Sequence, residues 1–406
     1  MSGAGPLHAF AGYGVELEYM IVDRKTLAVL PIADRLLGNS GEIPRGYFAW
    51  SNEVVLHLIE LKNAGPDPAL APLASGFQAE VRALNTALEP LGACLMPSAM
   101  HPWMNPATET RLWPHDHAAI YRTYDRIFDC KRHGWANLQS MHLNLPFADD
   151  AEFARLHAAV RLVLPILPAL AASSPFANGR FSGFLDTRME NYRGHQIIVP
   201  ATIGAVIPDS IASIADYHAR ILAPMYEEIA PHDPDGVLRH EWLNARGTIP
   251  RFDRNALEIR VIDAQECPQA DLAIAAAASA VVQVLYDAGP QLVETDRLAA
   301  ILSACIHHAE EAVVDDAGYL NALGFPWRRC QARELWQYLI DTRLAQVPDY
   351  ATHWQGPLET ILHHGPLARR ILKAVGEDYR RAHLEDVYRE LCACLAAGRL
   401  FGEGHG

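Results

Sequence analysis

The sequence has too little positive charge for a protein that binds nucleic acid or an anionic membrane. Its 406 residues include 34 Lys and Arg against 48 Asp and Glu, which gives a formal net charge of −14. Such an excess of acidic side chains repels phosphate backbones and anionic lipids. We therefore expect neither nucleic acid nor a membrane among its partners.

The sequence also shows no pattern typical of a disulfide framework, a membrane span or a leader peptide. The seven cysteines are an odd number without framework spacing, and the close pair Cys392 and Cys394 lies in a helical pattern that favours core packing over a zinc site. The apolar run 272–286 is short for a membrane span. The N-terminus has no basic start followed by an apolar stretch. These features predict a reduced, cytoplasmic protein.

Strand-like and helical patterns are mixed up to about residue 290, and helical patterns alone follow. Strands are predicted at 15–23, 54–62, 93–99, 137–145, 239–245 and 256–263. Helices are predicted at 70–90, 116–131, 150–172, 212–229 and 269–287, and then at 292–314, 332–345, 358–375 and 379–397. Because the strands alternate apolar and polar residues, an antiparallel sheet is favoured over a parallel one. We predict an α+β core over 1–290 and a helical C-terminal layer over 291–406.

The first strand carries two carboxylates on one face. Glu16 and Glu18 are two residues apart, so their side chains point the same way, while Val15, Leu17 and Ile21 point into apolar packing. Two neighbouring carboxylates repel each other unless a cation lies between them. A divalent metal would remove the repulsion; an exposed strand face on an acidic protein is the alternative.

The second strand-like segment supplies Glu53 and Glu60. Their separation of seven places them on opposite faces of a regular strand, so Glu53 must lie in the entering loop or a bulge must intervene. Glu60 lies in an otherwise apolar stretch, where an unpaired carboxylate is costly to bury. This cost favours a ligand role for Glu60.

Two further predicted strands add side chains that contain nitrogen to these carboxylates. His142 and Asn144 share one face of their strand, and Glu258 and Arg260 share one face of another. A structural histidine and a cross-strand salt bridge are the alternative interpretations. Hard oxygen ligands favour Mg²⁺ or Mn²⁺ over zinc, and an arginine beside them suits a phosphate. The sequence has neither a Gly-x-x-x-x-Gly-Lys-Ser/Thr loop nor a dinucleotide fingerprint, so bound ATP would be held through metals and side chains.

Four motifs resemble those of the type 2 glutamate–cysteine ligase family, also called carboxylate–amine ligases. They are Gly14-Val-Glu-Leu-Glu18, Asn52-Glu53 with Glu60, Met141-His142-Leu-Asn144-Leu, and Leu257-Glu-Ile-Arg-Val-Ile-Asp263. The resemblance spans residues 10–290. It implies a glutamine-synthetase-like fold, in which a curved antiparallel sheet of about six strands forms a funnel flanked by helices.

The resemblance also implies a function. It implies ATP- and Mg²⁺-dependent joining of a small carboxylate to a small amine through an acyl phosphate, in a homodimer. The implied metal ligands are Glu16, Glu18, Glu53, Glu60, His142 and Glu258. The implied catalytic residues are Arg260 and Glu53, and the implied nucleotide contacts are Arg260 and Asn144. The implied substrate-binding residues are Arg188, Arg193 and Arg246. For Arg188, a surface arginine in a polar loop is the alternative interpretation.

One stretch departs from the family. Many members have an Arg-Pro-His element before the last strand, whereas this chain reads Asn244-Ala-Arg246-Gly-Thr and has a longer loop without the histidine. The identities of the acid and the amine therefore stay open. A phosphotransferase on the same metal-lined sheet and a catalytically silent binding homologue are the alternative functions.

Overall fold

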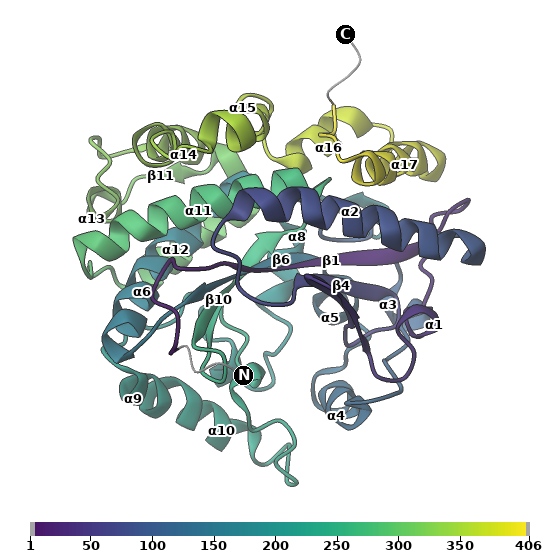
Figure 1. The fold of residues 1–406 in the computed structure, drawn as a ribbon, viewed down its shortest axis with the longest axis horizontal. Helices are drawn as coiled ribbons and strands as arrows, with labels where there is room; N and C mark the ends of the chain where they lie inside the picture. Colours follow the sequence, from purple (N-terminus) through teal and green to yellow (C-terminus); the bar gives the residue numbers. More distant parts are fainter. Residues whose placement is uncertain (1–4, 403–406) are drawn as a thin grey trace.

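The computed structural model describes residues 5–402. Within this range, eight strands form one sheet in the order β2-β3-β4-β1-β6-β10-β9, and β5 also pairs with β1 (Figure 1). The strands are β1 Gly14–Asp23, β2 Glu42–Arg45, β3 Phe48–Asn52, β4 Leu58–Asn63, β5 Ala93–Met96, β6 Ser140–Pro146, β9 Thr248–Arg251 and β10 Ala256–Asp263. Every pairing in it is antiparallel. The predicted α+β class with an antiparallel sheet is confirmed, although six strands was too few.

The apolar face of the sheet packs against long helices. Leu17, Tyr19 and Ile21 of β1 are fully buried in one core with Phe77 and Val81. The longest of these helices are α2 Leu70–Leu88, α6 Asp150–Val163 and α11 Pro268–Ala288. The period-two pattern of β1 therefore separates its apolar contacts from its carboxylates, as the sequence predicts.

The C-terminal segment contains α12 Thr295–His308, α13 Ala317–Ala322, α14 Ala332–Leu339, α15 Gln355–His364, α16 Leu367–Val375 and α17 Arg381–Ala397. Helices α14 to α17 form a layer over α2 and α11, whereas α12 lies outside this layer (Figure 1). Trp336 Nε1 donates to the carbonyl of Ile166 at 2.7 Å, and Gln78 Nε2 donates to the carbonyl of Leu395 at 2.8 Å. The layer is thus tied to the rest of the chain by buried hydrogen bonds as well as apolar packing.

Shorter helices complete the fold. They are α1 Asp34–Leu37, α3 Pro106–Glu109, α4 Ala118–Phe128, α5 His133–Ala136, α7 Pro168–Ala171, α8 Thr187–Tyr192, α9 Ile214–Tyr217 and α10 Ala223–Ile229. Two small two-stranded sheets lie apart from the main sheet. One pairs β7 Phe176–Ala177 with β8 Arg180–Phe181, and the other pairs β11 Val313–Val314 with β12 Cys330–Gln331. The expectation that strands end before residue 290 was therefore wrong for β11 and β12.

Proline and glycine set several helix ends. The break expected from Pro165 and Pro168 is confirmed, because α6 ends at Val163 and α7 begins at Pro168 after a 3-10 turn. Gly398 ends α17 with a φ of +75°, and a Cβ there would lie 2.8 Å from Gln78 Cδ. Both the left-handed backbone and the close approach call for glycine.

Three segments differ from the prediction. Residues 239–245 hold a 3-10 turn, Glu241–Leu243, and the strand beside β10 is β9, which a short hairpin loop connects to it. The predicted strand 54–62 is β4, which starts only at Leu58, and β3 precedes it. The predicted helix 358–375 is two helices, because Gly365 and Pro366 interrupt it.

Helix α11 is slightly longer than the predicted segment 269–287. Its 21 residues are long and apolar enough to cross a membrane by length and composition alone. In the described structure 72% of its most apolar window is buried, as in the core helix of a folded domain. It packs against α2, α6 and α15, which supplies its apolar surroundings.

Candidate active site

The register of the sheet brings the acidic side chains together. Glu18 lies opposite Glu60 of β4, and Glu16 lies opposite His142 of β6. Glu258 of β10 lies opposite Asn144 on the other side of β6. Because directly opposed residues point to the same face, these four neighbouring strands deliver their polar side chains to one place.

Glu53 reaches the same place from a loop. It follows β3, in the connection between β3 and β4, and Glu60 lies on β4 itself. This is one of the two arrangements that the odd spacing of Glu53 and Glu60 required. Ser51 Oγ donates to Glu60 Oε1 at 2.6 Å, and Lys62 Nζ lies 3.4 Å from the same oxygen.

His142 lies at the centre of the group. Its Nδ1 is 3.1 Å from Glu16 Oε2 and 3.7 Å from Glu258 Oε1, and its Nε2 is 3.8 Å from Glu18 Oε1. The Ser140 amide and hydroxyl both donate to Glu18 Oε2, at 2.7 and 2.8 Å. The imidazole thus contacts three carboxylates, and burial lowers its pKa less than these carboxylates raise it.

Two arginines flank Glu258. Arg251 Nη1 is 3.2 Å from Glu258 Oε2, and Arg260 Nε is 3.1 Å from Glu258 Oε1. Glu258 is almost completely buried, whereas both guanidinium groups keep some exposure to the cavity. Each arginine therefore has hydrogen-bonding capacity left for an anion in the cavity.

The pKa values of these carboxylates differ. Burial raises the pKa of Glu16, but its hydrogen bond to His142 and the charges of His142, Lys62 and Arg251 hold the pKa at about 2. Burial and the charge of Glu16 raise the pKa of Glu60 to about 7. Burial, Glu18 and Glu60 raise the pKa of Glu53 well above its ordinary value. A cation beside Glu53 and Glu60 would compensate this repulsion.

These side chains line one cavity of about 380 Å³. Within the described residues, two groups of three side chains have ligand atoms within 4.8 Å of one another: Glu16, Glu60 and His142, and Glu18, Glu53 and Glu60. Glu60 belongs to both groups. Oxygen donors with one imidazole match the preference of Mg²⁺ or Mn²⁺.

Arg188 has a different setting from the predicted polar loop. It lies on α8, has 1% of its surface exposed, and its Nε is 2.5 Å from Asp263 Oδ1. The alternative of a surface arginine is therefore wrong. Arg188 also borders the acidic cavity, so its predicted substrate contact stays a prediction.

The other predicted binding residues lie less centrally. Arg193 pairs with Glu190 and donates to Ser303 Oγ at 3.1 Å, and Arg246 is buried against the carbonyl of Ala201 at 2.9 Å. Neither arginine is among the described residues that line the cavity. Asn144 Nδ2 donates to Glu16 Oε1 at 3.4 Å and so lies beside the carboxylates.

The sequence reasoning missed several cavity residues. Arg251 has the clearest role, because it pairs with Glu258 from the neighbouring strand β9. The hairpin signal that would have identified it is Asn255, whose φ of +50° is a turn conformation that asparagine tolerates. The aromatic wall of Tyr121, Trp135 and Trp242 carried no sequence signal of its own.

Comparison with known proteins places these features in a family. The model of the family described as glutamate-cysteine ligase family 2 matches residues 13–390. An uncharacterized protein from Archaeoglobus fulgidus is 37% identical over 290 residues, which cover 70% of this chain and 78% of that protein. A protein from Rubrobacter xylanophilus, named provisionally as glutamate–cysteine ligase 2-3, is 31% identical over 47% of this chain and 48% of its own length.

Solved structures share the fold. A glutamate–cysteine ligase from Francisella tularensis, solved in complex with AMP, has a TM-score of 0.64 at 13% identity and covers 94% of this chain and 88% of its own. A bifunctional glutathione synthetase from Pasteurella multocida has a TM-score of 0.60 at 13% identity, covering 95% of this chain and 52% of its own. At this identity the likeness concerns the fold alone.

Proposed function

Because this chain belongs to glutamate–cysteine ligase family 2, we propose that it is an ATP- and Mg²⁺-dependent carboxylate–amine ligase. The proposed reaction joins a small carboxylate to a small amine as an amide, through an acyl-phosphate intermediate. A γ-glutamyl bond is the form of this reaction that the names of its relatives suggest.

One observation supports the proposal most strongly. Carboxylates from β1, β4, β10 and the loop after β3 converge with His142 in a single cavity, although they lie up to 242 positions apart between Glu16 and Glu258. A folded protein would gain nothing by bringing repelling carboxylates together unless something positively charged bound there. Metal-bound nucleotide phosphates fit this requirement.

The residues present fit divalent ions. Glu18, Glu53 and Glu60 would hold one ion, and Glu16, Glu60 and His142 a second, with Glu258 beside them. Bound there, Mg²⁺ would neutralise phosphate charge. The raised pKa values of Glu53 and Glu60 mean that binding would displace protons from them.

The remaining side chains suit the transfer of a phosphoryl group. Arg260 and Arg251 enter the cavity beside Glu258 and would stabilise the negative charge that the moving phosphoryl group carries. The carboxylate substrate attacks the γ-phosphate of ATP and displaces ADP. The neutral amine then attacks the acyl phosphate, and an amide forms as phosphate and a proton leave. Tyr121, Trp135 and Trp242 border the cavity and would help keep water from the acyl phosphate.

The test is a screen for ADP release over pairs of amino acids and amines, followed by mass spectrometry of the product. A ligase sustains ADP release over many turnovers only when acid, amine and Mg²⁺ are all present, and the product has the mass of the acid plus the amine minus water. A stable phosphorylated acid would instead indicate a phosphotransferase. Failure of every acid to support ADP release would contradict the proposal.

A pair of matched variants connects the activity to the cavity. Glu16→Gln should abolish ADP release, because it removes a carboxylate that contacts His142. Glu310→Gln, which changes a buried carboxylate paired with Arg369 in the C-terminal layer, should retain it. Equal activity of both variants would move the chemistry away from this cavity.

A further inference from the structure

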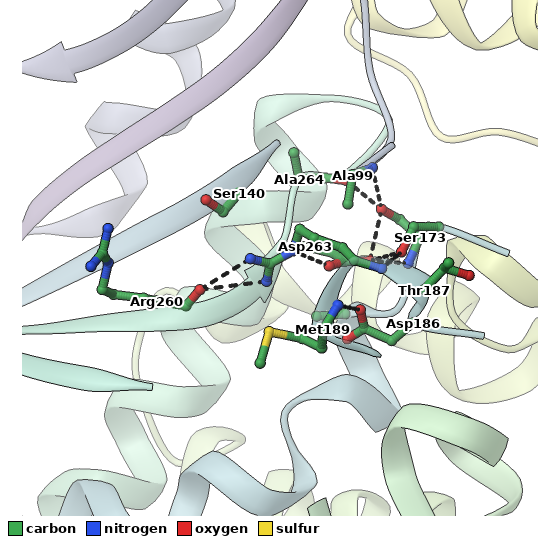
Figure 2. Close-up of polar contacts among 12 residues, drawn as sticks. Ala99, Ser140, Ser173, Asp186, Thr187, Met189, Arg260, Asp263 and Ala264 are labelled. Atoms are coloured by element: carbon green, nitrogen blue, oxygen red, sulfur yellow. Dashed lines mark hydrogen bonds and ion pairs between the residues drawn. The ribbon is translucent and has the colours of Figure 1, made fainter. Parts of the chain in front are cut away.

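Arg188 and Asp263 form a buried pair at the end of β10. The guanidinium of Arg188 contacts Asp263 and the backbone carbonyl of Arg260, two residues that Figure 2 labels. Its Nε lies 2.5 Å from Asp263 Oδ1, and its Nη1 and Nη2 lie 3.3 and 3.4 Å from the carbonyl oxygen of Arg260. Arg188 therefore contacts both ends of the segment 260–263.

This segment is the irregular part of the strand. The register of β10 against β6 shifts between Ile259 and Ile262, so the residues between them do not follow the regular ladder. The Arg260 amide donates to the carbonyl of Gly247 at 2.9 Å. A bulge of this kind leaves residues outside the ladder and bends the strand, and Arg260, on the same face as Glu258, is one of the residues without a partner on β6.

Asp263 is itself held from a second direction. Its Oδ2 accepts hydrogen bonds from the Ser173 amide at 2.8 Å and from Ser174 Oγ at 2.9 Å. Ser174 Oγ in turn accepts the Arg188 amide at 3.0 Å. The carboxylate of Asp263 is therefore fixed by α8 and by the segment before β7 (Figure 2).

The buried pair of Arg188 and Asp263 is also balanced in charge. Asp186 is fully buried nearby, and burial followed by the charge of Asp263 raises its pKa well above its ordinary value. This rise favours the neutral form of Asp186, and Asp263 is the carboxylate that Arg188 contacts through its Nε. Such a balanced pair can stay buried, whereas removing one partner would leave an uncompensated charge.

We propose that Arg188 is a positioning residue that, with Asp263, fixes the bulge of β10 so that the Arg260 side chain enters the acidic cavity. This inference rests on the proposed function, because Arg260 is the arginine assigned there to the moving phosphoryl group. This role differs from the predicted substrate contact of Arg188, because its Nε already pairs with Asp263 and both its terminal nitrogens face a backbone carbonyl.

The kinetic test is a double-mutant cycle between Arg188→Lys and Arg260→Ala. Arg188→Lys keeps the charge but loses the fork that contacts both Asp263 and the Arg260 carbonyl. We expect it to lower kcat by about 10- to 100-fold, the effect of misplacing a catalytic group by about 1 Å, with little change in KM for the acid. In the Arg260→Ala protein the same substitution should have almost no further effect.

Asp263→Asn and Arg370→Lys complete the design. Asp263→Asn should reproduce the loss of kcat seen with Arg188→Lys. Arg370→Lys, which changes a buried arginine paired with Glu266 away from the acidic cavity, should leave both constants unchanged. Independent, additive effects of Arg188→Lys and Arg260→Ala would overturn the proposal. So would a raised KM for the acid at unchanged kcat, which is the result expected of a substrate-binding arginine.

A second readout does not depend on ligase activity. The Nε–H resonance of Arg260, assigned by its loss in Arg260→Ala, should be sharp in the wild-type protein and should shift or broaden in Arg188→Lys and Asp263→Asn. An unchanged resonance in both variants would overturn the positioning role. Where these variants fold poorly, Ser174→Ala, which removes one hydrogen bond to Asp263 and one from the Arg188 amide, should shift the same resonance with a smaller fall in Tm. If the wild-type protein releases no ADP, the proposed function is wrong. The Arg260 resonance would still test the positioning role of Arg188.

Discussion

Replacing Glu60 by glutamine should stabilise the metal-free protein and weaken its metal binding. Glu60 is 8% exposed, lies opposite Glu18 in the sheet, and belongs to both groups of metal-ligating side chains. Glutamine has nearly the same shape, and its carbonyl oxygen can still accept the hydrogen bond from Ser51. The substitution therefore removes charge and leaves most of the packing intact.

The size of the effect follows from the pKa of Glu60. Burial and the charge of Glu16 raise this pKa from 4.5 to about 7. Between these values the folded protein binds more protons than the unfolded chain, so the free energy of unfolding falls as the pH rises through this window. Above pH 7 the ionised carboxylate costs about 3 kcal/mol at 1.36 kcal/mol per pH unit. For 406 residues, this cost corresponds to roughly 3 to 4 °C in Tm.

The assay is a thermal melt at pH 8 and at pH 4.5, each with EDTA or with excess Mg²⁺ and a non-hydrolysable ATP analogue. With EDTA at pH 8, Glu60→Gln should melt above the wild type, and at pH 4.5 the difference should nearly vanish. With Mg²⁺ and the analogue the order should reverse, because a ligand that binds the folded state raises Tm. Glu89→Gln, an exposed carboxylate beside Arg24, is the control and should behave as the wild type.

Two results would refute this reasoning. A variant that melts below the wild type with EDTA at pH 8 would mean that Lys62 and Ser51 more than compensate the charge of Glu60. An equal rise in Tm for both proteins on adding Mg²⁺ and the analogue would remove Glu60 from the metal site.

Three further predictions test other parts of the molecule. Arg260→Lys should lower turnover by about 100-fold with nucleotide affinity nearly unchanged. Steady-state kinetics and equilibrium nucleotide binding measure the two quantities, and weaker binding at unchanged turnover would instead make Arg260 a binding residue. Burial lowers the pKa of His57 to about 4 and those of His101 and His157 to about 3, so the unfolded chain alone takes up these protons below pH 6.5. Stability should therefore fall with pH from 6.5 toward 4, and urea titrations should show a slope smaller by about 1.4 kcal/mol per pH unit in His157→Leu. Trp336→Phe should cost about 1–3 kcal/mol in urea unfolding by leaving the Ile166 carbonyl without its donor, and an unchanged midpoint would contradict that contact.

Local patterns were enough to predict much of the fold. In β1, β6 and β10 the side-chain period of two fixes which residues share a face, so Glu16, Glu18 and His142 could be grouped before any tertiary contact was known. The last helix could be bounded because Gly398 supplies a recognisable end. These features depend on neighbouring residues alone.

Other features depend on contacts that sequence patterns do not encode. The strand β9 was missed because Pro250 and Arg251 weaken its strand pattern, and its pairing with β10 supplies what propensity does not. The setting of Arg188 depends on Asp263, 75 positions further along the chain. A signal did exist in Asp263 itself, since an aspartate that ends a buried apolar strand needs a partner.

The distribution of cations around the cavity indicates where a metal would bind first. Glu258 has Arg251 and Arg260 beside it, and Glu16 has His142, so these carboxylates are already compensated by the protein. Glu53 retains a raised pKa despite Arg260, and Glu60 despite Lys62, because burial and the other carboxylates outweigh these cations. A divalent ion gains most free energy where the protein's own cations compensate least. The group Glu18, Glu53 and Glu60 should therefore be the tighter of the two metal sites.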